Sequence, residues 1–185
     1  MRSHRPAATR ARGRAGAAAA GAVALLLAVL PAPAAPPPGG ATPRSPAQWE
    51  RLAHAIFAEL VAIDSTHAAG STAAAEALAA RFRAAGFPDS DIAVIGPQPD
   101  KMNIVVRLRG SSSERAAGLL LNGHLDVVEA GREGWSVEPF RLTEKDDYFY
   151  GRGAEDMKDE VAILATNLIR LHAEGYRPAR DVVLA

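Results

Sequence analysis

Residues 118–126 read Gly-Leu-Leu-Leu-Asn-Gly-His-Leu-Asp, an apolar run that ends in an imidazole and a carboxylate. A short run that is apolar throughout is typical of a β-strand covered on both faces, and the polar residues after it mark the loop where the strand ends. Ligands of open α/β sheets gather at the carboxyl ends of strands. The sequence therefore places His124 where a functional site is expected.

A second motif lies thirty residues further on. Residues 148–158 read Tyr-Phe-Tyr-Gly-Arg-Gly-Ala-Glu-Asp-Met-Lys, and an apolar stripe at helical spacing follows. The pattern predicts a strand, a tight exit and a helix over 157–172, with Asp156 at the helix start. Two interpretations of Asp156 stay open: an N-cap carboxylate, or a carboxylate that bridges two metal ions.

Helices and strands alternate along the rest of the chain. We expect helices at 48–63 and 72–85, strands at 91–95, 102–108, 118–121 and from 182 onward, and a hairpin-like pair at 140–142 and 147–150. This alternation predicts an α/β fold, with a mixed central sheet and helices on both faces.

The amino-terminal residues do not resemble a folded domain. Residues 1–35 hold five arginines, then an uncharged run of Ala, Gly, Val and Leu, then a small-residue cleavage site, which is the order of a signal peptide. The apolar run is shorter than the ~20 residues that span a bilayer, so we expect no stable membrane anchor. A basic nucleic-acid arm and a mitochondrial transit peptide are the weaker alternatives. The signal predicts a secreted or periplasmic protein.

Two further segments follow the leader. Residues 36–47 are Pro-rich and predict a stiff tether, and residues 48–185 are expected to form the amino-terminal part of a catalytic domain. Residues 181–185 begin an apolar strand with no turn after it. We therefore expect a truncated domain, that is, a fragment of a longer protein.

Composition narrows the chemistry. The chain has 21 basic and 21 acidic residues, and five of the basic ones lie in the leader, so the remainder is mildly acidic. Such a surface has no electrostatic reason to bind nucleic acid. The chain contains no cysteine, which excludes disulfides, thiol nucleophiles and thiolate metal sites. Any metal ion must be bound by His and carboxylates, a ligand set that suits zinc and its divalent neighbours.

The spacing of His124 and Asp126 suits a metal-binding imidazole. One ring nitrogen can bind the metal, and the other N–H then needs an acceptor that fixes the tautomer. Residues two apart in extended backbone share a face, so Asp126 can reach the back of the ring. On this pair alone, a surface histidine beside a helpful aspartate stays an open alternative.

Taken together, the two motifs resemble the dizinc exopeptidase and amidohydrolase family of aminoacylase, acetylornithine deacetylase, succinyl-diaminopimelate desuccinylase, carnosinase-type dipeptidases and glutamate carboxypeptidase. The resemblance is carried by Asn122-Gly-His-Leu-Asp-Val-Val128, by Trp135 with Glu138-Pro-Phe140, and by Tyr150-Gly-Arg-Gly-Ala-Glu-Asp-Met-Lys158.

The resemblance implies a role for each site residue. His124 would bind one zinc ion, Asp126 would be the catalytic residue that orients its ring, and Asp156 would bridge two zinc ions, which Co²⁺ or Mn²⁺ could replace. It also implies a cis peptide bond between Asp156 and Met157.

The resemblance further implies a metallopeptidase, of the carboxypeptidase or dipeptidase kind, that cleaves amide bonds of small peptides or N-acyl amino acids with a metal-activated water. The family's Glu-Glu pair, which supplies the general base, would follow Ala185, as would a further acidic ligand, the last His ligand and the domain that makes homodimer contacts. This chain alone is expected to bind metal weakly and to be inactive. A truncated, catalytically incomplete relic and an N-acyl amino acid deacylase are the alternatives.

Some residues depart from the family's pattern or flank the motifs. Glu129 stands where proline often follows, and Asp159 and Glu160 stand where two glycines often follow. We interpret the two acids as favourable charge in a first helical turn rather than as extra metal ligands. Trp135 is expected to pack over the loop between the motifs, and Arg152 to brace that loop by a hydrogen bond.

Overall fold

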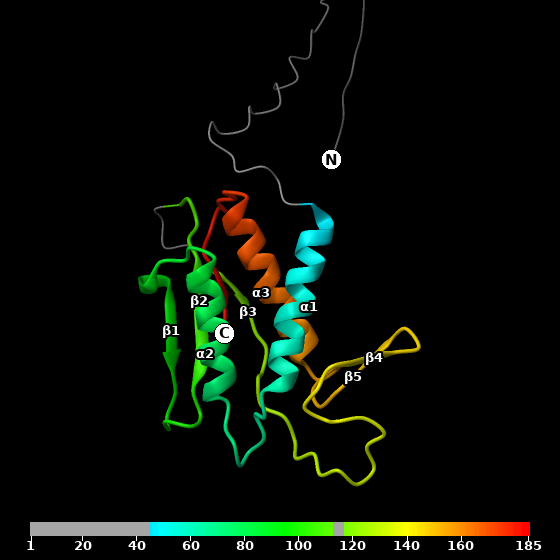
Figure 1. The fold of residues 1–185 in the computed structure, drawn as a ribbon. Helices are drawn as coiled ribbons and strands as arrows, with labels where there is room; N and C mark the ends of the chain where they lie inside the picture. The colour runs from blue at the N-terminus through cyan, green and yellow to red at the C-terminus, as the bar shows by residue number, and fades with distance from the viewer. Residues whose placement is uncertain (1–44, 113–116) are drawn as a thin grey trace, which may run out of the picture. The chain divides into compact units, whose positions relative to one another are not determined.

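The computed structural model describes residues 45–112 and 117–185 (Figure 1). The signal peptide expected over 1–35 and most of the tether expected over 36–47 lie outside these residues. Among the residues described, no helix is both long and apolar enough to cross a membrane. The elements are α1 (Pro46–Ala62), α2 (Thr72–Ala84), the 3₁₀ turn η1 (Asp89–Asp91), β1 (Ile92–Ile95), β2 (Asn103–Leu108), β3 (Leu119–Leu121), β4 (Thr143–Lys145), β5 (Tyr148–Tyr150), α3 (Lys158–Ala173) and β6 (Val182–Leu184).

The main sheet is mixed, as the sequence predicts. Its four strands lie in the order β1-β2-β6-β3. The pairs β1–β2 and β2–β6 are antiparallel, whereas β3 and β6 are parallel. Because β3 and β6 are parallel, the chain between them has to return to the end of the sheet at which β3 begins, and α3 is the helix of that crossover.

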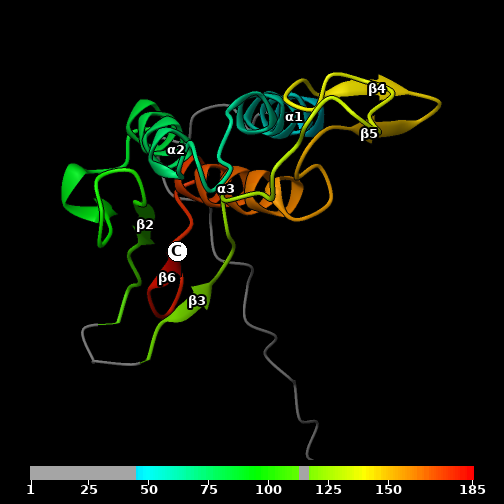
Figure 2. The same cartoon turned by 90° about the horizontal axis from the view of Figure 1, so that it is seen from below.

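All three long helices lie on one side of this sheet in the described part of the chain (Figure 2), whereas the sequence predicts helices on both faces. Alternation along β2 shows which face is covered: Ile104, Val106 and Leu108 are buried, and Val105 and Arg107 between them are only half-buried. Strands β1, β3 and β6 are apolar on both faces, so their composition alone could not show that one face has no helix on it.

The strand expected to be covered on both faces is instead exposed. In β3, Leu119 is 46% and Leu120 60% exposed, because β3 is the last strand of the sheet as described and has a neighbour on one side only. The uniform apolar pattern identified the strand correctly but not its environment.

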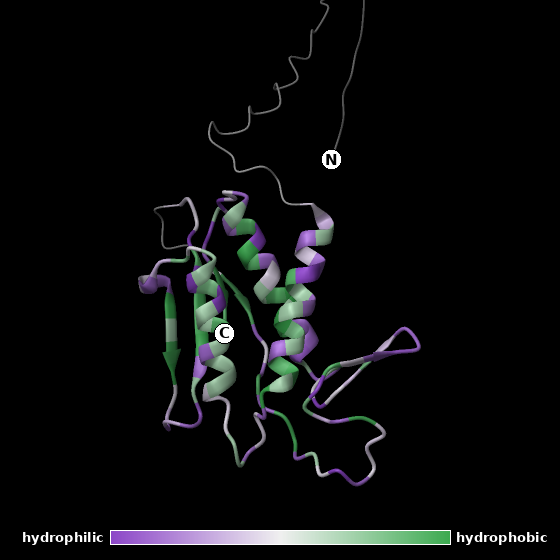
Figure 3. Cartoon of the chain, in the orientation of Figure 1, coloured by the Kyte–Doolittle hydropathy of each residue, from purple (hydrophilic) through white to green (hydrophobic). Residues whose placement is uncertain are grey.

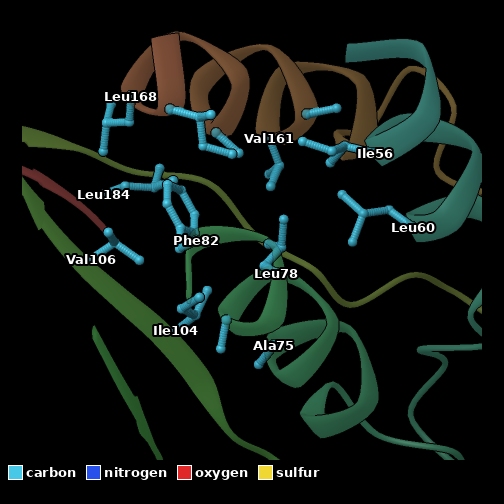
Figure 4. Close-up of a cluster of buried hydrophobic side chains, with 14 of the residues drawn as sticks. Ile56, Leu60, Ala75, Leu78, Phe82, Ile104, Val106, Val161, Leu168 and Leu184 are labelled. Atoms are coloured by element: carbon cyan, nitrogen blue, oxygen red, sulfur yellow. The ribbon is translucent and has the colours of Figure 1, made fainter. Parts of the chain in front are cut away.

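The core lies between the sheet and the helices. Phe82 of α2 is fully buried, and it packs among side chains that include Val106, Leu168 and Leu184 (Figure 4). Its ring meets Phe87 edge-to-face with centroids 5.1 Å apart, a favoured aromatic geometry. Figure 3 shows the matching distribution of hydropathy: the strands of the main sheet are mostly apolar, whereas the helices carry both apolar and polar residues.

Two predicted boundaries differ from the structure. Helix α1 begins at Pro46, inside the expected tether, because proline suits the first helical turn, where its missing N–H would have no partner. The first hairpin strand, expected at 140–142, lies at 143–145. Asp146 and Asp147 both have positive φ, of 54° and 63°, and such a two-residue turn fixes which residues pair on either side of it.

A buried carboxylate joins the turn η1, just before β1, to β2 and the residue that follows it. The side chain of Asp91 is 3% exposed, with Oδ1 2.7 Å from Nη2 of Arg107 and Oδ2 2.7 Å from Nε of Arg109. Burial raises the pKa of Asp91, but the hydrogen bonds and charges of the two guanidinium groups lower it more, so the pKa lies below its ordinary value.

Candidate metal centre

The segment after β3 presents its polar side chains outward. Leu125 and Val127 are buried, whereas His124 and Asp126 are exposed, with 45% and 74% of their side chains accessible. This alternation places the imidazole and the carboxylate on one face, as the sequence predicts. Gly123 allows the segment to lie against α3, because a Cβ there would be 2.8 Å from Cγ2 of Val161.

His124 and Asp156 meet at this site. Nε2 of His124 lies 2.9 Å from Oδ1 of Asp156. The N-cap of α3 is Met157, and no side chain caps the helix, so the alternative interpretation of Asp156 as an N-cap does not describe the structure. The Asp156 carboxylate points at the imidazole instead.

Asp126 contacts the other ring nitrogen. Nδ1 of His124 lies 3.0 Å from the backbone oxygen of Asp126 and 3.5 Å from its Oδ1. The backbone carbonyl can only accept, so this contact favours the tautomer in which Nδ1–H donates. The sequence predicted that the Asp126 carboxylate would hold the ring, but the nearer acceptor is the carbonyl of the same residue.

This tautomer makes the pair suitable for a cation. With the proton on Nδ1, a lone pair on Nε2 faces a carboxylate lone pair, and that arrangement is favourable only if a proton or metal ion lies between them. Zinc bound to both atoms at ~2.0–2.1 Å in tetrahedral geometry would need them ~3.3 Å apart. An opening of a few tenths of an ångström suffices, so the donor pair fits a divalent metal.

Electrostatics affect the imidazole in two directions. Partial burial lowers the pKa of His124, but the carbonyl of Asp126 and the carboxylate of Asp156 raise it more, so its pKa lies above the ordinary value. Because a metal displaces this proton, metal binding should weaken as the pH falls.

The pair borders a hollow of about 300 Å³ that residues 151–156 complete. Arg152 braces the wall of this hollow, as expected: its guanidinium carbon lies 4.9 Å from the centre of the Trp135 ring, and Nη2 donates to the backbone oxygen of Glu129 at 3.5 Å. Trp135 is half-buried over this loop. The Asp156–Met157 peptide bond is cis, as the resemblance implies.

His124 and Asp156 are the two candidate ligands at this site. Within residues 45–112 and 117–185, no three His, Asp or Glu side chains gather closely enough to bind one metal ion together. Asp159 and Glu160 lie in the first turn of α3, in agreement with their interpretation as favourable helix charge rather than as ligands.

Sequence reasoning missed two residues that support the site, Ser65 and Lys158. Both are fully buried, and burial lowers the pKa of Lys158 to about 8, against the opposing charge of Asp64. One signal was available for the lysine: a cation in the first turn of a helix opposes the helix dipole, which indicates a specific partner elsewhere.

Known proteins resemble parts of this chain in sequence. The family model "Peptidase family M20/M25/M40" matches residues 120–185. Over 95 residues, 51% of this chain, the sequence is 40% identical to an acetylornithine deacetylase of Vibrio campbellii. Over 67 residues, 36% of the chain, it is 49% identical to a probable succinyl-diaminopimelate desuccinylase of Staphylococcus aureus. The matches span 23% and 16% of these relatives.

Solved structures give the same fold. Human carnosine dipeptidase 1 superposes with a TM-score of 0.55 and 26% identity, over 76% of this chain and 34% of the dipeptidase. The M20 metallo-carboxypeptidase Sso-CP2 of Sulfolobus solfataricus gives 0.58 with 19% identity, over 71% and 29%. The resemblance and the α/β fold class inferred from the sequence are thereby confirmed. Residues 120–185 therefore match Peptidase family M20/M25/M40 in sequence, and the described chain resembles a member of that family in fold.

Proposed function

We propose that the protein hydrolyses amide bonds of small peptides or N-acyl amino acids at a two-metal site, and that this chain supplies two of the metal ligands. The observation that carries the proposal is the 2.9 Å approach of His124 to Asp156. Because the matched relatives are several times longer than the matched segment, the general base and the remaining ligands are assigned to other parts of the complete protein.

Each residue has a distinct part. His124 would bind one metal through Nε2 while its Nδ1–H donates to Asp126, and Asp156 would offer its two oxygens to two cations. Asp126 would keep the ring oriented. When bound, zinc, or Co²⁺ or Mn²⁺ in its place, would supply the Lewis acidity that polarises a carbonyl and activates water. The hollow beside residues 151–156 would receive the scissile amide.

The substrate class has two candidates. Similarity to an acetylornithine deacetylase and a probable desuccinylase favours an N-acyl amino acid, and the fold of a carnosine dipeptidase favours a small peptide. The leader at 1–35 supports a secreted or periplasmic location, which favours peptides. A homodimer would form through segments outside this chain.

Zinc binding to the metal-free full chain tests the proposal. Calorimetry should show binding by the native chain and at least a ~10-fold loss of affinity in His124→Ala and in Asp156→Ala. Glu155→Ala, an exposed carboxylate next to the bridge, is the matched control and should bind as the native chain does. Native affinity in both ligand variants would refute the assignment.

Measurements of turnover distinguish the complete enzyme from the 185-residue chain alone. With added zinc, the 185-residue chain should hydrolyse neither dipeptides nor N-acetyl amino acids, because the general base that takes the proton of the attacking water is assigned to another part of the complete protein. Hydrolysis by this chain that disappears in His124→Ala would show that the general base lies within it. If the complete natural protein lacks the remaining ligands and the general base, it is the catalytically incomplete relic.

A further inference from the structure

The chain that follows α1 forms a corner, residues 63–66, that buries two polar side chains. Helix α1 gives way at Ile63 to extended backbone, with φ −84° and ψ 118°. Ser65 is 0% and Thr66 3% exposed. A buried hydroxyl without a partner is costly, so the contacts that Ser65 makes are obligatory, and they lead to the metal centre.

Ser65 holds the His124 segment from two sides. Its Oγ donates to the backbone oxygen of Leu125 at 2.6 Å, and its own backbone oxygen accepts from the Val127 amide at 3.1 Å. These bonds flank Asp126, so they fix the strand-like alternation that turns His124 and Asp126 outward.

Lys158 holds the Asp156 segment to the same corner. Its Nζ donates to the backbone oxygens of Leu60 at 2.7 Å and Ile63 at 2.9 Å. These carbonyls end α1, where unpaired acceptors and the helix dipole both favour a cation. Lys158 is two residues after Asp156, so the short intervening chain leaves the carboxylate little freedom to move.

Gly153 closes the gap between the two segments. Its φ is +76°, and a Cβ placed there would be 2.7 Å from Cγ1 of Val127 and 3.2 Å from Cδ of Lys158. The His124 segment and the Asp156 segment therefore pack against one another across a glycine, with no room for a side chain.

We propose that the corner 63–66 sets the distance between His124 and Asp156, with Ser65 and Lys158 as its two positioning residues. A metal site tolerates only about 0.5 Å of displacement, and these are the polar bonds that join both segments to one element. The inference rests on the proposed function in so far as the two residues share a metal, but the mechanical coupling itself exists without metal.

Two measurements on the full chain test the coupling. The first is zinc affinity, which Ser65→Ala and Lys158→Met should each weaken by ~10-fold or more, the usual effect of losing a supporting contact. The second, without metal, is hydrogen exchange of the Val127 amide. Lys158→Met should accelerate this exchange, although Lys158 does not touch that amide, because the corner loosens.

Ser71→Ala is the matched control. Ser71 Oγ also donates to a distant backbone oxygen, that of Met102 at 2.8 Å, but it joins neither segment of the site. The Ser71→Ala variant should lower the free energy of unfolding without changing zinc affinity. Hydrogen exchange of the Val127 amide should change no more than that of other amides. If Lys158→Met does not fold, Ser65→Ala alone tests the positioning role. Its two readouts are zinc affinity and hydrogen exchange of the Lys158 amide, which donates to the backbone oxygen of Gly153 at 2.9 Å.

The outcomes separate the two proposals. Native zinc affinity and unchanged amide exchange in the folded variants would overturn the positioning role while leaving the metal site intact. If the native chain binds no zinc, the proposed function fails, and amide exchange still decides the coupling: acceleration across the corner supports it, and native rates refute it.

Discussion

Nε2 of His124 and Oδ1 of Asp156 lie 2.9 Å apart although 32 positions separate the two residues in the chain. One follows β3 and the other precedes α3, so the fold, and not local sequence, brings them together. Their contact makes the two motifs parts of one site.

Asp156 and Asp126 should differ in their effect on metal affinity. Asp156→Asn removes the charge that faces the cation and should weaken zinc binding by ~10–100-fold. Asp126→Asn should cost less, because the Asp126 backbone oxygen, at 3.0 Å, remains on Nδ1 while the lost carboxylate oxygen was 3.5 Å away. Isothermal titration of both variants checks the order, and a larger loss in Asp126→Asn would contradict it.

Gly153→Ala should destabilise the chain more than an equivalent change elsewhere. The new Cβ would collide with Val127 in addition to the strain of a positive φ, for a total of about 2–4 kcal/mol. Gly134→Ala is the control, since Gly134 has φ +81° and open space around it. Urea unfolding of both variants measures the difference. Equal losses in the free energy of unfolding would mean that the contact of the new Cβ with Val127 is not destabilising.

Phe82→Ala should remove about 3–5 kcal/mol from the free energy of unfolding, because the ring is fully buried and the cavity cannot close completely. Phe149, 45% exposed in the hairpin, provides the comparison. Thermal unfolding of Phe149→Ala should show a much smaller loss, and similar losses for both would place the stabilising core elsewhere.

Asp91 should make stability depend on acid pH. Its pKa is lower in the folded chain than in the unfolded one, so its stabilising contribution is complete above the ordinary value of 3.8 and disappears as the pH falls through the lowered folded value. Asp91→Asn should therefore lose stability at pH 7 and show a flatter decline in acid. Denaturation between pH 2 and 7 tests this expectation, and parallel curves would contradict it.

The sequence predicted the features that depend on local patterns. The alternation that turns His124 and Asp126 outward follows from strand periodicity. The elements α2, β1, β2 and β3 begin and end within one residue of their expected positions. The exposure of Leu120 depends on which strands are neighbours, and composition does not carry that information.

The supporting contacts could not be predicted for a related reason. Ser65 and Leu125 are 60 positions apart, and Lys158 and Leu60 are 98 apart. Nothing in the residues near Ser65 indicates a partner on another element. A serine after a helix is an ordinary turn residue until the tertiary fold buries it.

The position of β3 at the end of the described sheet has a consequence for behaviour in solution. Its outer backbone amides and carbonyls can pair with another strand, and Leu119 and Leu120 add exposed apolar surface beside them. Proteins normally protect such strands with charge, proline or a bulge, and Leu-Leu-Leu has none of these. Light scattering at rising concentration should therefore reveal self-association that begins at β3.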